Sequence, residues 1–160
     1  MQLKNTYSAR EVAALTGLSA RQLQWWESRR LFMPAVSTKR TAAGGFTERR
    51  YSPVDLLELM VLADLRRHGL TIPRIRQLLD ALRERFGIRL FDAIGGTGPI
   101  TLLTDGREIY ARTTAGEFFN LLRDPDQALL VVGNEPELRA ISSRLRATKN
   151  PKKKKKKISR

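Results

Sequence analysis

One short stretch near the N-terminus holds side chains that can read base pairs. Arg21, Gln22 and Gln24 follow Ser19 within one predicted helix, and Trp25 comes next. Arg can form paired hydrogen bonds with guanine and Gln can do so with adenine. The indole N–H of Trp25 can be donated to a phosphate. The alternative interpretation of these positions is an ordinary solvated helix face.

A second set of side chains suits a nucleic-acid backbone, because cations and hydroxyls bind phosphate oxygens. Arg66 and Arg67 also suit the C-terminal end of a helix dipole, and Tyr51 could instead be a half-buried hinge residue. For Glu27 we predict an ion pair that orients an arginine of the basic stretch. The backbone candidates are Tyr7, Ser8, Lys39, Arg40, Arg49, Arg50, Tyr51, Arg66 and Arg67.

The net charge of +14 over 160 residues is unevenly distributed. Residues 1–86 carry +7, residues 87–148 carry −1 and residues 149–160 carry +8. Such asymmetry indicates a polyanionic partner. The lysine run at 152–157 can add affinity for any polyanion, or it can act only as a solubilising tail.

The composition argues against several classes of protein. The chain has no cysteine and one histidine, so thiolate metal sites, disulfides and a histidine-based catalytic relay are not expected. No apolar run is long enough for a membrane-spanning helix. We expect a cytoplasmic protein without a cofactor, a metal site or catalytic residues.

The elements that must position these side chains begin with two short helices. Ser8 with Glu11, and Ser19 with Gln22, form two capping boxes on either side of Gly17. They predict helices through about residues 16 and 29, joined tightly as in a helix-turn-helix. Inward-facing positions are predicted at Val12, Leu15, Leu23 and Trp26.

Residues 31–50 lack helical periodicity and contain Gly44-Gly45, which predicts a β-hairpin, or wing. A third helix should begin at Ser52-Pro53 and a fourth at Thr71. The expected buried stripe of the third is Leu57, Val61 and Leu65, and that of the fourth is Ile75, Leu78, Leu79, Leu82 and Phe86.

After Gly87 the pattern changes toward sheet. Residues 100–104 and 108–113 flank Asp105-Gly106, which is a hairpin signal. A short helix is expected around Phe118 to Leu122, a strand at 128–132 and a final helix at 135–147. The predicted fold class is therefore α+β. It comprises a winged helix-turn-helix at 1–86, a small ββαβα-type domain at 87–148 and a disordered basic tail at 149–160.

Two runs carry a family resemblance: YSAREVAALTGLSARQLQWWESRRLFMP and RRYSPVDLLELMVLADLRRHGLTIPRIRQLL. Over residues 7–85 they resemble the DNA-binding domain of the MerR family of bacterial transcription regulators. The resemblance implies a winged helix-turn-helix that binds double-stranded DNA as a homodimer at an inverted-repeat promoter site. It also implies distortion of that DNA, RNA polymerase as a partner, and residence in the bacterial nucleoid.

The chain departs from the family pattern in three places. Gln24 stands where an arginine or another polar residue usually precedes the aromatic pair, Trp25-Trp26 replaces the commoner tyrosine pair, and no heptad helix follows Gly87. The operator, any ligand and the dimer geometry therefore stay open. Two other interpretations also remain: a nucleoid-organising or recombination-accessory protein, and a DNA-tethered protein-interaction module.

Overall fold

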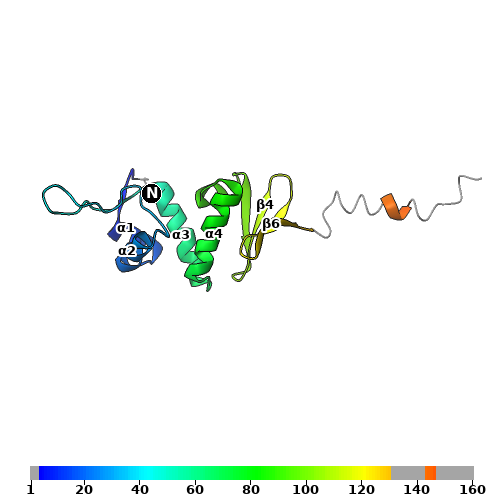
Figure 1. Cartoon of the computed structure of the whole chain (residues 1–160), viewed down its shortest axis with the longest axis horizontal. Helices are drawn as coiled ribbons and strands as arrows, with labels where there is room; N and C mark the ends of the chain where they lie inside the picture. The colour runs from blue at the N-terminus through cyan, green and yellow to red at the C-terminus, as the bar shows by residue number, and fades with distance from the viewer. Residues whose placement is uncertain (1–3, 131–142, 147–160) are drawn as a thin grey trace, which may run out of the picture. The chain divides into compact units, whose positions relative to one another are not determined.

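The computed structural model describes residues 4–130 and 143–146. Its first two helices, α1 (Ala9–Thr16) and α2 (Ala20–Ser28), meet at Gly17, whose φ of 76° is left-handed and therefore favours glycine. The Ser19 side chain accepts the Gln22 N–H at 3.0 Å, and Gln22 Oε1 accepts the Ser19 N–H at 2.8 Å. At the start of α1, Ser8 accepts the Glu11 N–H at 3.2 Å. Because these capping contacts span only three residues, the sequence was enough to predict where both helices begin. Figure 1 labels the two helices.

Helices α3 (Pro53–Arg67) and α4 (Ile72–Phe86) follow. The stripe predicted on α3 is wrong by about one position: Leu57 is 43% exposed, and the buried face holds Leu56, Leu59, Leu62 and Ala63. Elements on more than one side cover α3, so periodicity alone does not identify its buried face. On α1 the predicted inward Leu15 is likewise exposed, and the inward position belongs to Thr16, whose hydroxyl donates to the Val12 carbonyl at 2.7 Å.

The segment predicted as a hairpin is mostly irregular. Strand β1 (Tyr7–Ser8) pairs antiparallel with β2 (Arg50–Tyr51), and isolated bridges join Val36 to Arg50 and Arg40 to Phe46. We call residues 36–50, which contain these two bridges, the 36–50 loop. It is drawn in cyan in Figure 1 and extends away from the helices.

The C-terminal part of the described fold is an antiparallel sheet. The short 3₁₀ helix η1 (Leu90–Ala93) leads to β3 (Ile100–Thr104), β4 (Ile109–Thr113), β5 (Phe118–Asn120) and β6 (Asp124–Leu129), in that spatial order. The predicted turn at Asp105-Gly106 is confirmed by the β3–β4 register, in which Thr104 pairs with Ile109.

One prediction for this region is wrong and another is met only in part. The helix expected near Phe118 is strand β5, which pairs with β4 through Phe119 and Ala111. A run of three residues is too short to distinguish a helical from a strand period. The strand expected at 128–132 is met at residues 128 and 129, which belong to β6, but β6 begins earlier, at Asp124. Residues 131 and 132 lie outside the described residues. The final predicted helix lies outside the described residues, except for 143–146, which are helical. The basic tail also lies outside them.

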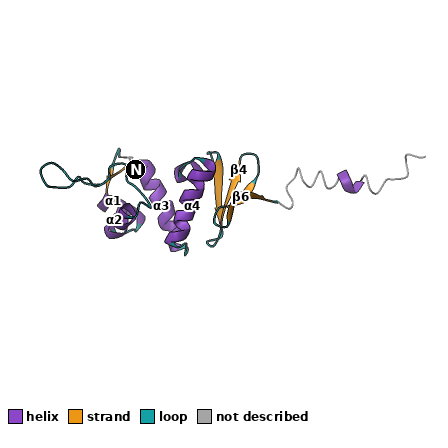
Figure 2. Ribbon diagram, in the orientation of Figure 1, coloured by secondary structure: helices purple, strands orange, loops and turns teal. Residues whose placement is uncertain are grey.

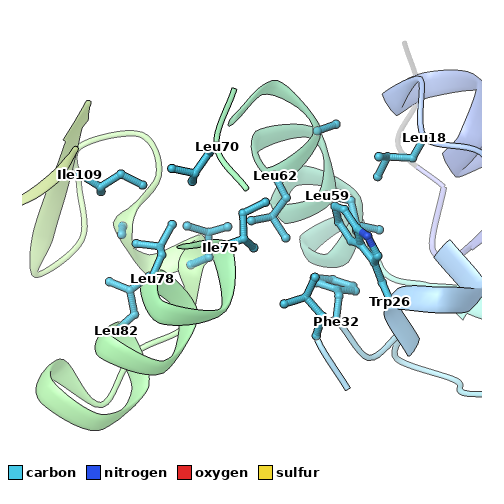
Figure 3. Packing of buried hydrophobic residues seen from close by; sticks show 14 of the residues in the cluster. Leu18, Trp26, Phe32, Leu59, Leu62, Leu70, Ile75, Leu78, Leu82 and Ile109 are labelled. Carbon is cyan, nitrogen blue, oxygen red and sulfur yellow. The ribbon is translucent and has the colours of Figure 1, made fainter. Parts of the chain in front are cut away.

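One hydrophobic cluster runs from α2 through α3 and α4 to the sheet (Figure 3). Leu18 and Trp26 lie at one end of the view and Ile109 at the other. The rings of Phe86 and Phe119 pack edge to face, with their centroids 5.7 Å apart. Residues up to Ala128 form one compact unit. Figure 2 shows the strands β4 and β6 on the far side of α4 from α1 and α2. Within residues 4–130 and 143–146, no helix is long and apolar enough to cross a membrane.

Candidate nucleic-acid interface

Helix α2 presents a polar outer face. Leu23 and Trp26 are buried, with Trp26 only 3% exposed, as their helical spacing predicted. Arg21 and Gln24 are exposed, and Trp25 is 42% exposed. Adjacent residues on a helix point about 100° apart, so the burial of Trp26 directs Trp25 outward.

Arg29 joins this face, although the sequence analysis did not single it out. Its guanidinium lies 5.6 Å from the centroid of the Trp25 ring, which is a cation–π contact. The two residues are four positions apart, and that spacing was the available signal. The Arg29 carbonyl accepts Nη2 of Arg76 from α4 at 3.0 Å, so this end of α2 is tied to the helical core.

The Gln22 side chain is exposed, but its oxygen already has a hydrogen-bond partner within the chain. Its side-chain oxygen already accepts the Ser19 N–H in the capping box. A bidentate contact with adenine requires that oxygen as well as the amide N–H₂. The geometry therefore leaves the amide donors of Gln22 for a partner, whereas no such contact occupies Gln24 in the described residues.

The 36–50 loop lies beside α2. A hollow of about 410 Å³ is bordered by Gln24 of the helix and by Thr38, Phe46 and Arg49 of the loop, among others. Lys39 and Arg40 are exposed on the loop, and Arg50 is half-buried, with an ion pair to Glu48 at 3.6 Å. The structure thus places one helix candidate, Gln24, beside one loop candidate, Arg49.

The predicted ion pair of Glu27 is confirmed. Its carboxylate binds Nε of Arg49, and its other oxygen accepts the Thr38 N–H at 2.8 Å. Both side chains of the ion pair are mostly buried. The charge of Arg49 is therefore largely engaged in an internal ion pair, which holds the loop against α2.

Tyr7, Ser8 and Tyr51 lie at the base of the same region. The two tyrosines are buried and face each other across β1 and β2. The Tyr7 hydroxyl accepts the Lys4 N–H at 3.2 Å, while Ser8 caps α1 by accepting the Glu11 N–H. Burial raises the pKa of the Tyr51 hydroxyl to about 12, so this group is neutral at physiological pH.

Arg66 and Arg67 end α3 and are exposed, yet both have internal partners. Arg66 Nη1 donates to the Leu70 carbonyl at 2.9 Å, and Arg67 Nη1 donates to the Thr16 carbonyl at 3.1 Å. Arg67 also approaches Asp64 at 3.3 Å. Arg67 therefore connects the end of α3 to the end of α1, a function that helix-dipole reasoning did not anticipate.

The described part of the chain has no group of three or more His, Asp or Glu side chains that could hold a metal ion. The groups gathered around α2 are cations, amides and an indole. They can donate hydrogen bonds to anions and to base edges.

Comparison with known proteins places this geometry in a family. Residues 7–82 match the family described as MerR HTH family regulatory protein. Similar curated proteins include uncharacterized HTH-type transcriptional regulators from Mycobacterium bovis and from two strains of Mycobacterium tuberculosis. Each is 32% identical over 117 residues, which cover 73% of this chain and 48% of the relative. The chain thus spans about half the length of the curated relatives it matches. Residues 7–82 therefore form a region of the MerR HTH regulatory type.

Proposed function

We propose that this protein is a sequence-specific, DNA-binding regulator of transcription. The observation that carries the proposal is the exposed polar face of α2 beside a basic loop, within the region that matches the family. The relatives are named transcriptional regulators, which supports the same function.

In this proposal α2 enters the major groove and the 36–50 loop acts as the wing. Arg21 reads guanine, Gln24 reads adenine, and Gln22 contributes its amide donors. Trp25, with Arg29 stacked on it, lies against the sugar-phosphate backbone. Additional backbone contacts are assigned to Lys39, Arg40, Arg49 and Arg50 of the loop, to Tyr7, Ser8 and Tyr51 at its base, and to Arg66 and Arg67 beyond α3.

The exposure of these side chains and their internal partners indicate how much each should contribute to binding the DNA backbone. Lys39 and Arg40 are exposed, and no internal ion pair is found for either within the described residues, so they should contribute most. Tyr51 should contribute least directly, because its side chain is only 1% exposed. Its contribution is to support the loop from beneath.

We further propose that the protein binds an inverted repeat as a homodimer, distorts the DNA and acts with RNA polymerase at a promoter in the bacterial nucleoid. A two-fold dimer requires two half-sites related by the same symmetry. In this scheme residues 1–86 bind DNA, and residues 87–148 serve the dimer, an effector or a protein contact. The tail at 149–160 adds affinity without sequence choice.

Selection of bound fragments from a bacterial genomic library, followed by footprinting, tests this function. A symmetric footprint with bent DNA and discrete promoter sites is the expected result. A one-sided footprint without bending would contradict the dimer and the distortion. Broad coverage without preferred sites would instead favour the nucleoid-organising alternative, for which the lysine run is the supporting feature.

Two separate variants distinguish site recognition from general DNA affinity. One is Arg21→Ala, and the other is a tail variant in which Lys152 to Lys157 are replaced by Gln. Arg21→Ala should lose about 5- to 100-fold in preference for the selected site over random DNA. The tail variant should flatten the salt dependence of binding and leave site preference within twofold. An equal loss of preference in both variants would count against recognition through α2.

A further inference from the structure

Two carboxylates lie on the buried face of α3. The side chains of Asp55 and Glu58 are only 4% and 5% exposed, and they are three residues apart on the helix. A buried charge is costly unless it is paired and hydrogen-bonded. Accordingly, burial raises the pKa of the Glu58 carboxyl, while the nearby Arg89 cation opposes that increase.

The cation that serves both acids comes from the segment after α4. Arg89 Nη2 lies 2.7 Å from Glu58 Oε1 and 3.2 Å from Asp55 Oδ1. Its backbone N–H is donated to Asp92 Oδ2 at 3.1 Å, which fixes Arg89 at the start of η1. Arg89 is the one ion-pair partner found for Glu58 within the described residues. It lies outside the 7–82 region that matches the family.

Asp55 also holds the base of the 36–50 loop. Its Oδ2 accepts the N–H of Ala35 and the N–H of Ser52, both at 2.9 Å. Ala35 immediately precedes Val36, which is bridged to Arg50 where the loop closes. One carboxylate therefore connects three segments: the entrance of the loop, the start of α3 and, through Arg89, the segment that leads into the sheet.

We propose that Arg89 is a positioning residue for DNA binding. By neutralising Asp55 and Glu58, it keeps the Asp55 carboxylate dehydrated and aimed at Ala35, and thereby sets where the 36–50 loop leaves the fold. Part of the geometry of the DNA-binding region is therefore determined by a side chain from beyond that region. The inference rests on the proposed function, because it assigns the loop to DNA.

Arg89→Met is the direct test, with Arg83→Met as the matched control. Arg83 is an exposed α4 arginine that pairs with Asp80 at 2.8 Å, and no hydrogen bond or ion pair joins it to Asp55 or Glu58 within the described residues. In the full chain, amide hydrogen exchange at Ala35 should accelerate at least 10-fold in Arg89→Met and by less than twofold in Arg83→Met. Affinity for the selected DNA site should fall about 5- to 20-fold in Arg89→Met only.

Two further variants separate positioning from loss of stability. Glu58→Gln combined with Arg89→Met removes the acid that lacks a partner, so the double variant should recover much of the folding stability. It should still show fast exchange at Ala35 and weakened DNA binding. Arg89→Lys keeps the charge, so it should partly restore both slow exchange at Ala35 and DNA affinity. The double variant also serves as the test protein if Arg89→Met does not fold.

The proposal is overturned if exchange at Ala35 and DNA affinity in the double variant are both within twofold of their values in the parent protein. Arg89 would then act only through folding stability. If the parent protein shows no preferred DNA site, the proposed function fails. Exchange at Ala35 still decides in that case whether Arg89 positions the loop.

Discussion

Helix α2 and the 36–50 loop lie beside each other, but they are held in place by different means. Helix α2 is stabilised by its own residues, through the Ser19–Gln22 capping box and the burial of Leu23 and Trp26. The loop has two isolated bridges and internal hydrogen bonds at Thr41 and Thr47. Side chains from outside it, chiefly Glu27 and Asp55, join it to the helices. Changes at these two carboxylates, which lie outside the loop, should therefore disturb it.

The difference has a physical basis. A helix satisfies its backbone groups internally, so it needs only caps and one buried face. An irregular loop leaves many N–H groups without ladder partners, and two of those at this loop, Thr38 and Ala35, are accepted by carboxylates of α2 and α3. Carboxylate acceptors form stronger hydrogen bonds than neutral ones.

Trp26→Ala should produce the largest effect, because it removes the buried anchor of α2. We expect the free energy of unfolding to fall by about 3–5 kcal/mol, measured by urea denaturation. The matched control is Trp25→Ala on the exposed face, which should cost less than about 1 kcal/mol while weakening DNA binding. Similar destabilisation by both changes would contradict the assignment of one tryptophan to the core and the other to the surface.

Arg49→Met should weaken the loop more than the helix. It leaves the mostly buried Glu27 carboxylate without its cation, which should cost about 1–3 kcal/mol. Hydrogen exchange at the Thr38 amide should accelerate while exchange at Leu23 changes little. Lys39→Met, on the exposed part of the loop, serves as the control for loss of charge. Equal acceleration at Thr38 and Leu23 would show that the loop and helix respond as one unit.

Tyr51 provides a pH test at the base of the loop. Its pKa is raised to about 12 from an ordinary value near 10, so the folded state keeps this proton longer than the unfolded state does. The contribution is present below pH 10 and is lost as the pH rises toward 12, which amounts to a loss on the order of 1 kcal/mol by pH 11. Tyr51→Phe should lack this component of the alkaline stability loss, as measured by denaturation at pH 9 and pH 11. An unchanged loss in Tyr51→Phe would contradict the raised pKa.

Ser19→Ala should have the smallest effect, at about 1 kcal/mol, because it removes one side of the capping box. It also releases the Gln22 side chain from its cap. We expect faster exchange at the Gln22 amide and no change at Thr38. The corresponding change Ser8→Ala in α1 is the control for the loss of a cap elsewhere. Faster exchange at Thr38 in Ser19→Ala would mean that the loop depends on the start of α2.

Prediction from sequence succeeded where interactions were local. The caps at Ser8, Ser19 and Ser52 and the turn at Asp105-Gly106 involve residues within four positions of each other, so residue types alone indicate them. The Glu27–Arg49 pair is long-range, but it could be anticipated because an acid within a basic stretch needs a cation.

The candidate site was predicted only in part. Helical period placed Trp26 inside and Trp25 outside, but it did not reveal that the capping box occupies the Gln22 side-chain oxygen. Nor did it show that Arg67 binds the Thr16 carbonyl, since that contact joins residues 51 positions apart.

The sequence by itself determined the order of the helices, the positions where they begin and the residue types available to meet DNA, because these depend on short-range contacts. Only the tertiary structure decided which face of α3 is buried, that Phe118 continues in a strand, and that Arg89 reaches Asp55 and Glu58. Each of these depends on which distant surfaces pack together and exclude water. A buried acid and its cation can lie far apart in sequence, and the cost of leaving that acid unpaired arises only once packing has removed its solvent.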